Sequence, residues 1–166
     1  VLEQKDRRQL THYVKEAPTP YRAMHSFSFF EKSLLAVSND DSLFTARSMD
    51  FEINVKGAEG RQNRSFQHSF ENVSLKRDRL LEYYSKKDMS GLGDGVGMDM
   101  IIEAKNLPGQ WPAISKMFFD DENRLWVATI VENFEVYKWW ILKKSGEVIT
   151  KFTWPRDKVI QEVRNG

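Results

Sequence analysis

Residues 113–155 alternate between runs of β-branched and aromatic residues and three short polar clusters. The clusters DDEN at 120–123, VENFE at 131–135 and KKSG at 143–146 are rich in residues that favour turns. Runs of this kind separated by turn-forming residues are typical of antiparallel strands. The pattern therefore predicts a four-stranded antiparallel meander.

A similar pattern occupies residues 21–72. Phe51, Ile53 and Val55 alternate with polar residues, which is the period of a half-buried strand. Polar turns at 39–42 and 58–60 separate the predicted strands. The preceding residues 1–20 are polar and end in two prolines, so they predict a weak helix or an outer strand followed by a linker.

The two strand-rich segments align with each other. An offset of 82 places residues 37–46 on 119–128, so that both contain an acidic turn followed by a leucine and an aromatic residue. Four extra residues in the next loop give a second set of equivalences: Phe51, Ile53, Val55, Gly60 and Phe66 fall on Tyr137, Trp139, Ile141, Gly146 and Phe152. We interpret the segments as repeats. The alternative is that two β meanders agree by coincidence.

The connecting segment differs in character. Residues 73–87 contain good helix formers, with Ser74 as a possible N-cap, and predict one short helix. Glycines at 91, 93, 95 and 97 then predict a flexible linker, and Ser85 to Met98 is expected to be the most mobile internal segment. The chain thus divides into 1–20, a first unit at 21–72, a helix and linker at 73–110, and a second unit with the start of a further strand at 111–166.

The second unit resembles a blade of bacterial six-bladed β-propellers of the NHL and TolB-like kind. Four strands in about forty residues is the length of one blade. The motif positions are occupied by Asp120, Asn123, Leu125, Trp126, Val127, Leu142 and Gly146. The resemblance covers roughly 24–70 and 111–155, and the first unit has Ser38 for the first aspartate. It implies a mostly β fold of propeller blades and a periplasmic or cell-envelope location, but it specifies fold better than function.

Composition limits the possible functions. Of the 166 residues, 40% are hydrophobic and 30% are charged, and the net charge is +1. No apolar run is long enough to span a bilayer, and no basic field suggests a nucleic-acid partner. Because cysteine is absent, disulfides, thiolate zinc sites and cysteine nucleophiles are excluded. The chain begins without a signal segment, which we interpret as a processed or truncated product, and the compartment stays open.

Candidate chemistry is sparse. The acidic cluster 120–123 lacks the ligand spacing of a calcium loop, and a hairpin turn explains it better. GLGDGVG lacks the spacing of a dinucleotide-binding loop. His12, His25 and His68 have no metal-ligand spacing. The sequence therefore predicts no catalytic residue, no metal site and no cofactor.

Tryptophans are the candidate contact residues, since Trp126, Trp139, Trp140 and Trp154 lie in adjacent predicted strands that could form an aromatic binding face. Successive residues of a strand point to opposite faces of the sheet, so one of Trp139 and Trp140 belongs to the core. The other one, together with Trp111, is a candidate for contact with a ligand or a partner. Packing between blades is the alternative role for these rings.

The function predicted from the sequence is that of a non-enzymatic binding or interaction module, a fragment of a β-propeller. One alternative is a propeller-type hydrolase or lyase, and another is a stand-alone β sandwich or roll. Blades bury both faces against neighbours, so two repeats leave two faces open. The chain is therefore expected to self-associate through these faces or to be stable only within a longer protein.

Overall fold

A computed structural model describes residues 2–6, 9–14, 19, 21–25, 27–58, 63–85, 96–105, 107–160 and 163–164. The chain forms two compact units. The first contains Val1–Phe30 and Ser74–Trp111, and the second contains Glu31–Val73 and Pro112–Gly166. Each unit is described by itself below.

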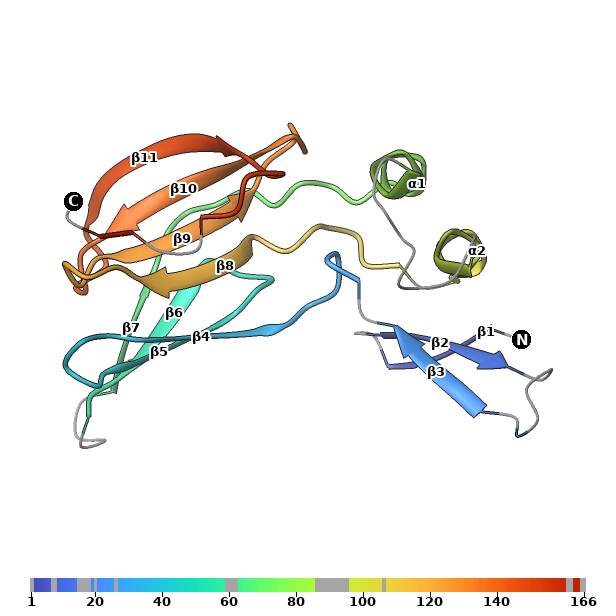
Figure 1. Cartoon of the computed structure of the whole chain (residues 1–166), viewed down its shortest axis with the longest axis horizontal. Coiled ribbons are helices and arrows are strands. Elements are labelled where there is room, and N and C mark those ends of the chain that lie inside the picture. The colour runs from blue at the N-terminus through green and yellow to red at the C-terminus, as the bar shows by residue number, and fades with distance from the viewer. Residues whose placement is uncertain are drawn as a thin grey trace. The chain divides into compact units, whose positions relative to one another are not determined.

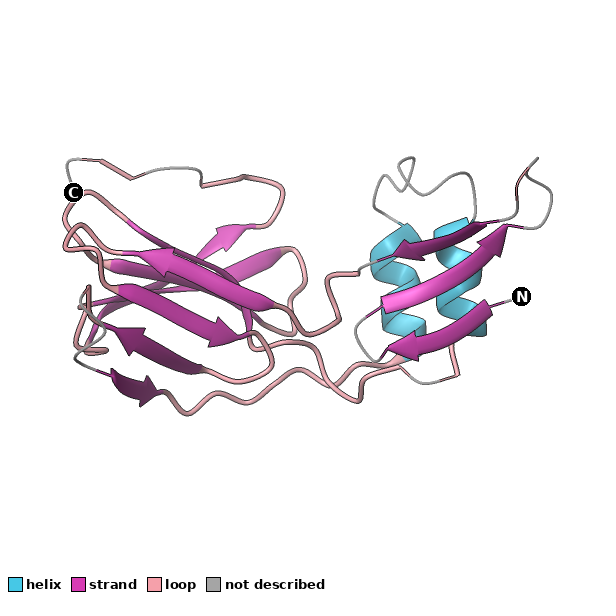
Figure 2. Cartoon of the chain, turned by 90° about the horizontal axis from the view of Figure 1, so that it is seen from below, coloured by secondary structure: helices cyan, strands magenta, loops and turns pink. Residues whose placement is uncertain are grey.

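The first unit combines a small antiparallel sheet with two helices. The strands are β1 (Leu2–Asp6), β2 (Gln9–Val14) and β3 (Tyr21–His25), paired in chain order. The helices are α1 (Arg77–Ser85) and α2 (Val96–Glu103). Both helices lie over one face of the sheet (Figure 2). The N-terminal segment, predicted as a weak helix or an outer strand, therefore contains two strands of a separate sheet, and β2 is its central strand.

The short helix predicted between the repeats is present, but the described residues also contain a second helix that was not predicted. Helix α1 lies within the predicted span, whereas α2 begins at Val96 inside the segment that was expected to be a mobile linker. Residues 86–95 of that segment lie outside the described residues. The glycines suppressed the helical signal, but Met100 and Ile101 of α2 are buried, and packing of an apolar face overrides weak intrinsic propensity.

Arg77 joins the two helices. Its guanidinium donates hydrogen bonds from α1 to the carbonyls of Ile101, at 3.3 Å, and Ala104, at 2.5 Å, and to that of Ile102. The carbonyls of Ile101 and Ile102 belong to the last turn of α2, where carbonyls lack a partner within the helix, and Ala104 directly follows the helix. A cation at a helix C-terminus is also favoured by the helix dipole. Arg77 thus compensates for the lack of a basic residue in the last turn of α2.

The second unit contains two four-stranded antiparallel meanders, as predicted (Figure 1). Sheet I comprises β4 (Ser33–Val37), β5 (Leu43–Arg47), β6 (Glu52–Lys56) and β7 (Asn63–Gln67), in chain order. Sheet II comprises β8 (Ile114–Phe119), β9 (Leu125–Ile130), β10 (Val136–Leu142) and β11 (Val148–Pro155), also in chain order. The fold is therefore mostly β. After Pro155, residues 156–160 form a turn and an irregular segment rather than the predicted further strand.

The first hairpins of the two sheets have the same turn. In sheet I, Ser38 N–H donates to Ser42 O at 3.0 Å and Asp41 N–H donates to Ser38 O at 2.9 Å. In sheet II, the bonds from Asp120 to Arg124 and from Asn123 to Asp120 are both 3.1 Å long. Asp41 and Asn123 have φ of 59° and 63°, a left-handed conformation that aspartate and asparagine tolerate. The predicted alignment of the two acidic turns therefore has a structural counterpart.

Strand register extends this equivalence. Ile53 pairs with Ala46 and Phe66 in sheet I, and Trp139 pairs with Ala128 and Phe152 in sheet II. We call the face of each sheet that carries these residues its forward face, and the opposite face its rear face. In sheet I the forward face includes Phe44 and Val55, and their equivalents in sheet II are Trp126 and Ile141.

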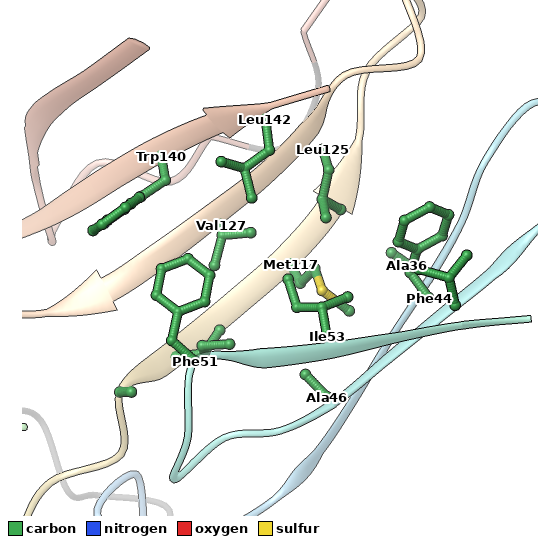
Figure 3. Close-up of a cluster of buried hydrophobic side chains, with 13 residues drawn as sticks. Ala36, Phe44, Ala46, Phe51, Ile53, Met117, Leu125, Val127, Trp140 and Leu142 are labelled. Carbon is green, nitrogen blue, oxygen red and sulfur yellow. The ribbon is translucent and has the colours of Figure 1, made fainter. Parts of the chain in front are cut away.

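The forward face of sheet I packs against the rear face of sheet II. Figure 3 shows side chains of the two faces pointing toward one another. The buried cluster contains these residues: Ala36, Phe44, Ala46, Phe51, Ile53 and Val55 from the first repeat, and Ala113, Ile114, Met117, Leu125, Val127, Trp140 and Leu142 from the second. Equivalent faces therefore do not meet. The second sheet is stacked on the first in the same sense, as successive units of a repeat architecture are.

Polar contacts at the hairpins fix this arrangement. Asn39 N–H donates to Asn123 Oδ1 at 3.0 Å, and the Lys144 ammonium group pairs with Asp40. Arg64 donates to the Lys144 carbonyl at 2.6 Å. Contacts of this kind between polar loops do not contribute as much energy as the apolar core, but they define the position of one sheet on the other.

Gly146 is held against the other sheet. Its φ is 95°, and a Cβ atom added there would lie 2.5 Å from Cγ of Phe66. We expect Gly146→Ala to lower the free energy of unfolding by about 1–3 kcal/mol, because it combines left-handed strain with overpacking. Urea denaturation measures this. Gly109→Ala is the matched control, since no atom lies within 4 Å of the added Cβ, and an equal loss in both variants would contradict the prediction.

Candidate interaction surfaces

Asp120 is a structural residue. Its side chain is fully buried, and its carboxylate accepts hydrogen bonds from Arg124 N at 2.8 Å, Arg124 Nε at 2.7 Å and Trp126 Nε1 at 2.7 Å. Burial alone would raise the pKa of Asp120, but the three hydrogen bonds and the Arg124 charge outweigh it and hold the pKa below its ordinary value. Asp120 therefore orients Trp126 and closes the turn of sheet II.

Asp40 has a different environment in the equivalent turn. It is exposed, and its pKa is lowered by hydrogen bonds from Lys144 and Ser38 and by the charge of Lys144. The buried position of Asp120 is taken by Ser38, whose hydroxyl donates to Asp40 Oδ1 at 2.5 Å. Because Ser38 is neutral, it needs no cationic partner, and Ser42 stands at the position that is equivalent to Arg124. Both acidic clusters thus serve the turns, as the sequence predicted for 120–123.

The forward face of sheet II carries a cluster of aromatic rings. The centroid of Trp126 lies 5.8 Å from that of Phe118, 6.0 Å from that of Trp139 and 5.8 Å from that of Phe152. Trp139 is only 1% exposed because neighbouring rings cover it, whereas the other three rings are half-buried. Trp154 lies on the same face, opposite Tyr137, and is 39% exposed. We call this surface the aromatic face.

The three tryptophans singled out from the sequence lie in three different environments. Trp111 is fully buried in the first unit, 6.2 Å from Phe29 and 5.5 Å from Tyr83 between ring centroids. Trp140 belongs to the core between the two sheets, with its ring 4.9 Å from Phe51. Trp139 lies at the base of the aromatic face. The expected division of Trp139 and Trp140 between two faces is therefore present, and the predicted contact role of Trp111, Trp139 and Trp140 stays a prediction.

Sequence reasoning missed two accessible rings of the aromatic face, Phe118 and Phe152. Phe118 and Phe152 share it with Trp126 because β8, β9 and β11 pair in register with their neighbours. In the alignment with an offset of 82, Phe118 is the equivalent of Ala36, which is buried in sheet I. The repeat alignment was therefore the signal that could have found this surface.

Two cationic side chains lie near Tyr137 at one end of the aromatic face. The guanidinium of Arg156 lies 4.4 Å from the ring centroid and Lys116 Nζ lies 5.7 Å from it, while Ser115 Oγ donates to the phenol oxygen at 3.1 Å. Partial removal from water lowers the pKa of Lys32; Tyr137 opposes this shift and Lys116 adds to it. The arrangement places positive charge beside the aromatic rings.

His68 has a packing role. Its ring lies 5.1 Å from Phe51 and 5.4 Å from Trp140, and Nε2 is 2.9 Å from the Gly146 carbonyl. His12 and His25 lie in strands β2 and β3, and their side chains are outside the described residues. Within the described ranges, no three histidine or acidic side chains gather as metal ligands would, and no helix is long and apolar enough to cross a membrane.

No protein-family model matches the sequence, and no curated protein is significantly similar to it. The propeller resemblance therefore depends on the residues and on the arrangement of the sheets described above.

Proposed function

We propose that this protein is a non-enzymatic interaction module built from two successive blades of the β-propeller type. The observation that supports the proposal is the stacking of the two repeats, forward face on rear face. Blades of a propeller are related in this way, because each blade presents one face to the preceding blade and the other face to the following one.

A stand-alone β sandwich accounts less well for the faces. Each sheet of a sandwich buries one face and exposes an alternating set of polar residues on the other. Sheet II instead has apolar or aromatic residues on both faces, with Val127 and Trp140 on one and Trp126 and Trp139 on the other. Such a sheet suits a position between two neighbours, so the aromatic face is the proposed binding surface.

The anionic dye 1-anilinonaphthalene-8-sulfonate tests whether this surface is accessible. Its apolar rings fit an aromatic patch, and its sulfonate suits the nearby Lys116 and Arg156. In dilute native protein, we expect dye fluorescence to fall several-fold in a variant with Phe152→Ser and Trp154→Ser. Ile102→Ser, which removes an exposed apolar side chain of α2, is the control.

Near-ultraviolet circular dichroism would verify that the variants keep native packing. Equal dye fluorescence in the wild type, the double variant and the control, with all three folded, would contradict the proposed binding surface. The alternative of a propeller-type hydrolase or lyase stays an untested prediction.

A further inference from the structure

The rear face of sheet I exposes two large aliphatic side chains on its edge strand β4. Leu35 is 60% exposed and Val37 is 52% exposed. Their equivalents in sheet II are Met117 and Phe119, which pack against sheet I. Met117 is buried, and the Phe119 ring lies 4.8 Å from Phe44 between centroids. Leu35 and Val37 thus hold the positions that make the contact between sheets I and II, but in sheet I both side chains are exposed.

The aromatic face of sheet II offers the matching surface. In sheet I, Ala36 and Phe44 belong to the forward face that receives Met117 and Phe119. The equivalents of Ala36 and Phe44 in sheet II are Phe118 and Trp126, which are half-buried rings. One molecule therefore carries two surfaces that could form a further contact of the same kind: the rear face of sheet I and the aromatic face of sheet II.

We propose that the chain self-associates head to tail, with the rear face of sheet I of one copy seated on the aromatic face of sheet II of the next copy. Val37 of one copy then packs against Trp126 of its neighbour, as Phe119 packs against Phe44 within one chain. This proposal rests on the stacking that supports the proposed function, and it names a second copy as the partner.

The hairpins of the junction differ in charge from those of the contact within the chain. Within one chain, Asp40 of the first hairpin pairs with Lys144 of the last one. The equivalent of Asp40 in sheet II is Glu122, and the equivalent of Lys144 in sheet I is Ala58, two residues after Lys56. Ala58 is neutral and the Glu122 carboxylate pairs with Arg124 within the chain, so the junction has no counterpart of the Asp40–Lys144 ion pair.

The junction is weaker than the contact within the chain. On the rear face of sheet I, Asn54 and Lys56 stand at the positions of Trp140 and Leu142, so the apolar part is confined to β4 and β5. A head-to-tail contact uses different surfaces on its two sides, which gives a closed ring or an open chain of copies. We therefore expect assembly that depends on concentration.

Sedimentation velocity with two blocked variants tests the proposal. The rear-blocked variant carries Leu35→Glu and Val37→Glu, and the forward-blocked variant carries Thr150→Glu and Trp154→Glu, four positions that are exposed in one chain. Burying an unpaired carboxylate is costly, so each variant alone is expected to associate at least about 100-fold more weakly than the wild type. Ile102→Glu on α2 is the control that keeps wild-type association.

An equimolar mixture of the two blocked variants is the decisive sample. It retains one intact junction, between the rear face of the forward-blocked variant and the aromatic face of the rear-blocked variant. We expect a heterodimer and no larger species. A wild type that stays monomeric up to millimolar concentration, or blocked variants that associate like the wild type, would overturn the proposal. If the dye still binds a monomeric wild type, the aromatic face serves a different partner and the proposed function is retained.

Discussion

Replacing Asp120 with alanine is expected to lower the free energy of unfolding of the second unit by about 2–4 kcal/mol, the cost of removing a buried acceptor shared by several N–H donors. The substitution removes the acceptor of the Trp126 indole N–H, while the Arg124 guanidinium loses one partner and keeps its pairing with Glu122. It also removes the acceptor of the Arg124 backbone N–H, so the turn between β8 and β9 loses its internal support.

Two other variants separate the possible causes. Asp120→Asn keeps the shape but places amide hydrogens near N–H donors, so we expect a loss of about 1–3 kcal/mol. Asp121→Ala removes an exposed carboxylate from the same turn and should change stability by no more than about 0.5 kcal/mol. Chemical denaturation measures all three. Similar losses for Asp120→Ala and Asp121→Ala would show that Asp120 does not hold the turn.

The dependence on pH gives an independent readout of Asp120. Because its folded-state pKa lies below the ordinary value of 3.8, its stabilising contribution is complete above that value. The contribution is lost as the pH falls through the lower folded-state pKa. The difference in unfolding free energy between the wild type and Asp120→Asn should therefore shrink in acid below 3.8. A difference that grew in acid would contradict the depressed pKa.

Phe44→Ala is expected to have an effect of similar size. Phe44 is fully buried at the centre of the contact between the sheets, with the Phe119 ring 4.8 Å away. Truncating a buried phenylalanine to alanine costs about 3–5 kcal/mol, because the transfer energy and the energy of the cavity add. Ile149→Ala, at an apolar position that is 46% exposed, should cost no more than about 0.5 kcal/mol.

Equal melting temperatures for Phe44→Ala and Ile149→Ala, measured at the same protein concentration, would mean that the two sheets do not share the core described here. The comparison is informative because both variants lose an apolar side chain from the same unit. Only the partners of the lost side chain differ.

The repeat could be predicted from the sequence because its signals are local. A left-handed position in the turn requires a residue such as Asp41 or Asn123, and alternation along Phe51, Ile53 and Val55 gives a strand directly. The same alternation placed Trp139 and Trp140 on opposite faces. These features depend on neighbouring residues alone.

The features that could not be predicted depend on contacts between distant segments. Helix α2 is weak in sequence and is stabilised by burial of Met100 and Ile101 and by Arg77 of another helix. The sequence also gave no reason to choose which face of each sheet meets the other. That choice buried Trp140 and left Phe118 and Phe152, which the sequence did not single out, on the aromatic face.

The stacking of forward face on rear face is the central claim, and a pair of double-mutant cycles tests it most directly. Phe44→Leu is combined with Phe119→Leu in one cycle and with Trp126→Leu in the other. We predict a coupling free energy of about 0.5–3 kcal/mol between Phe44 and Phe119, which are in contact, and additivity within about 0.5 kcal/mol for Phe44 and Trp126, which lie on equivalent faces. Coupling of Phe44 to Trp126 and not to Phe119 would contradict the account, because equivalent faces would then be in contact.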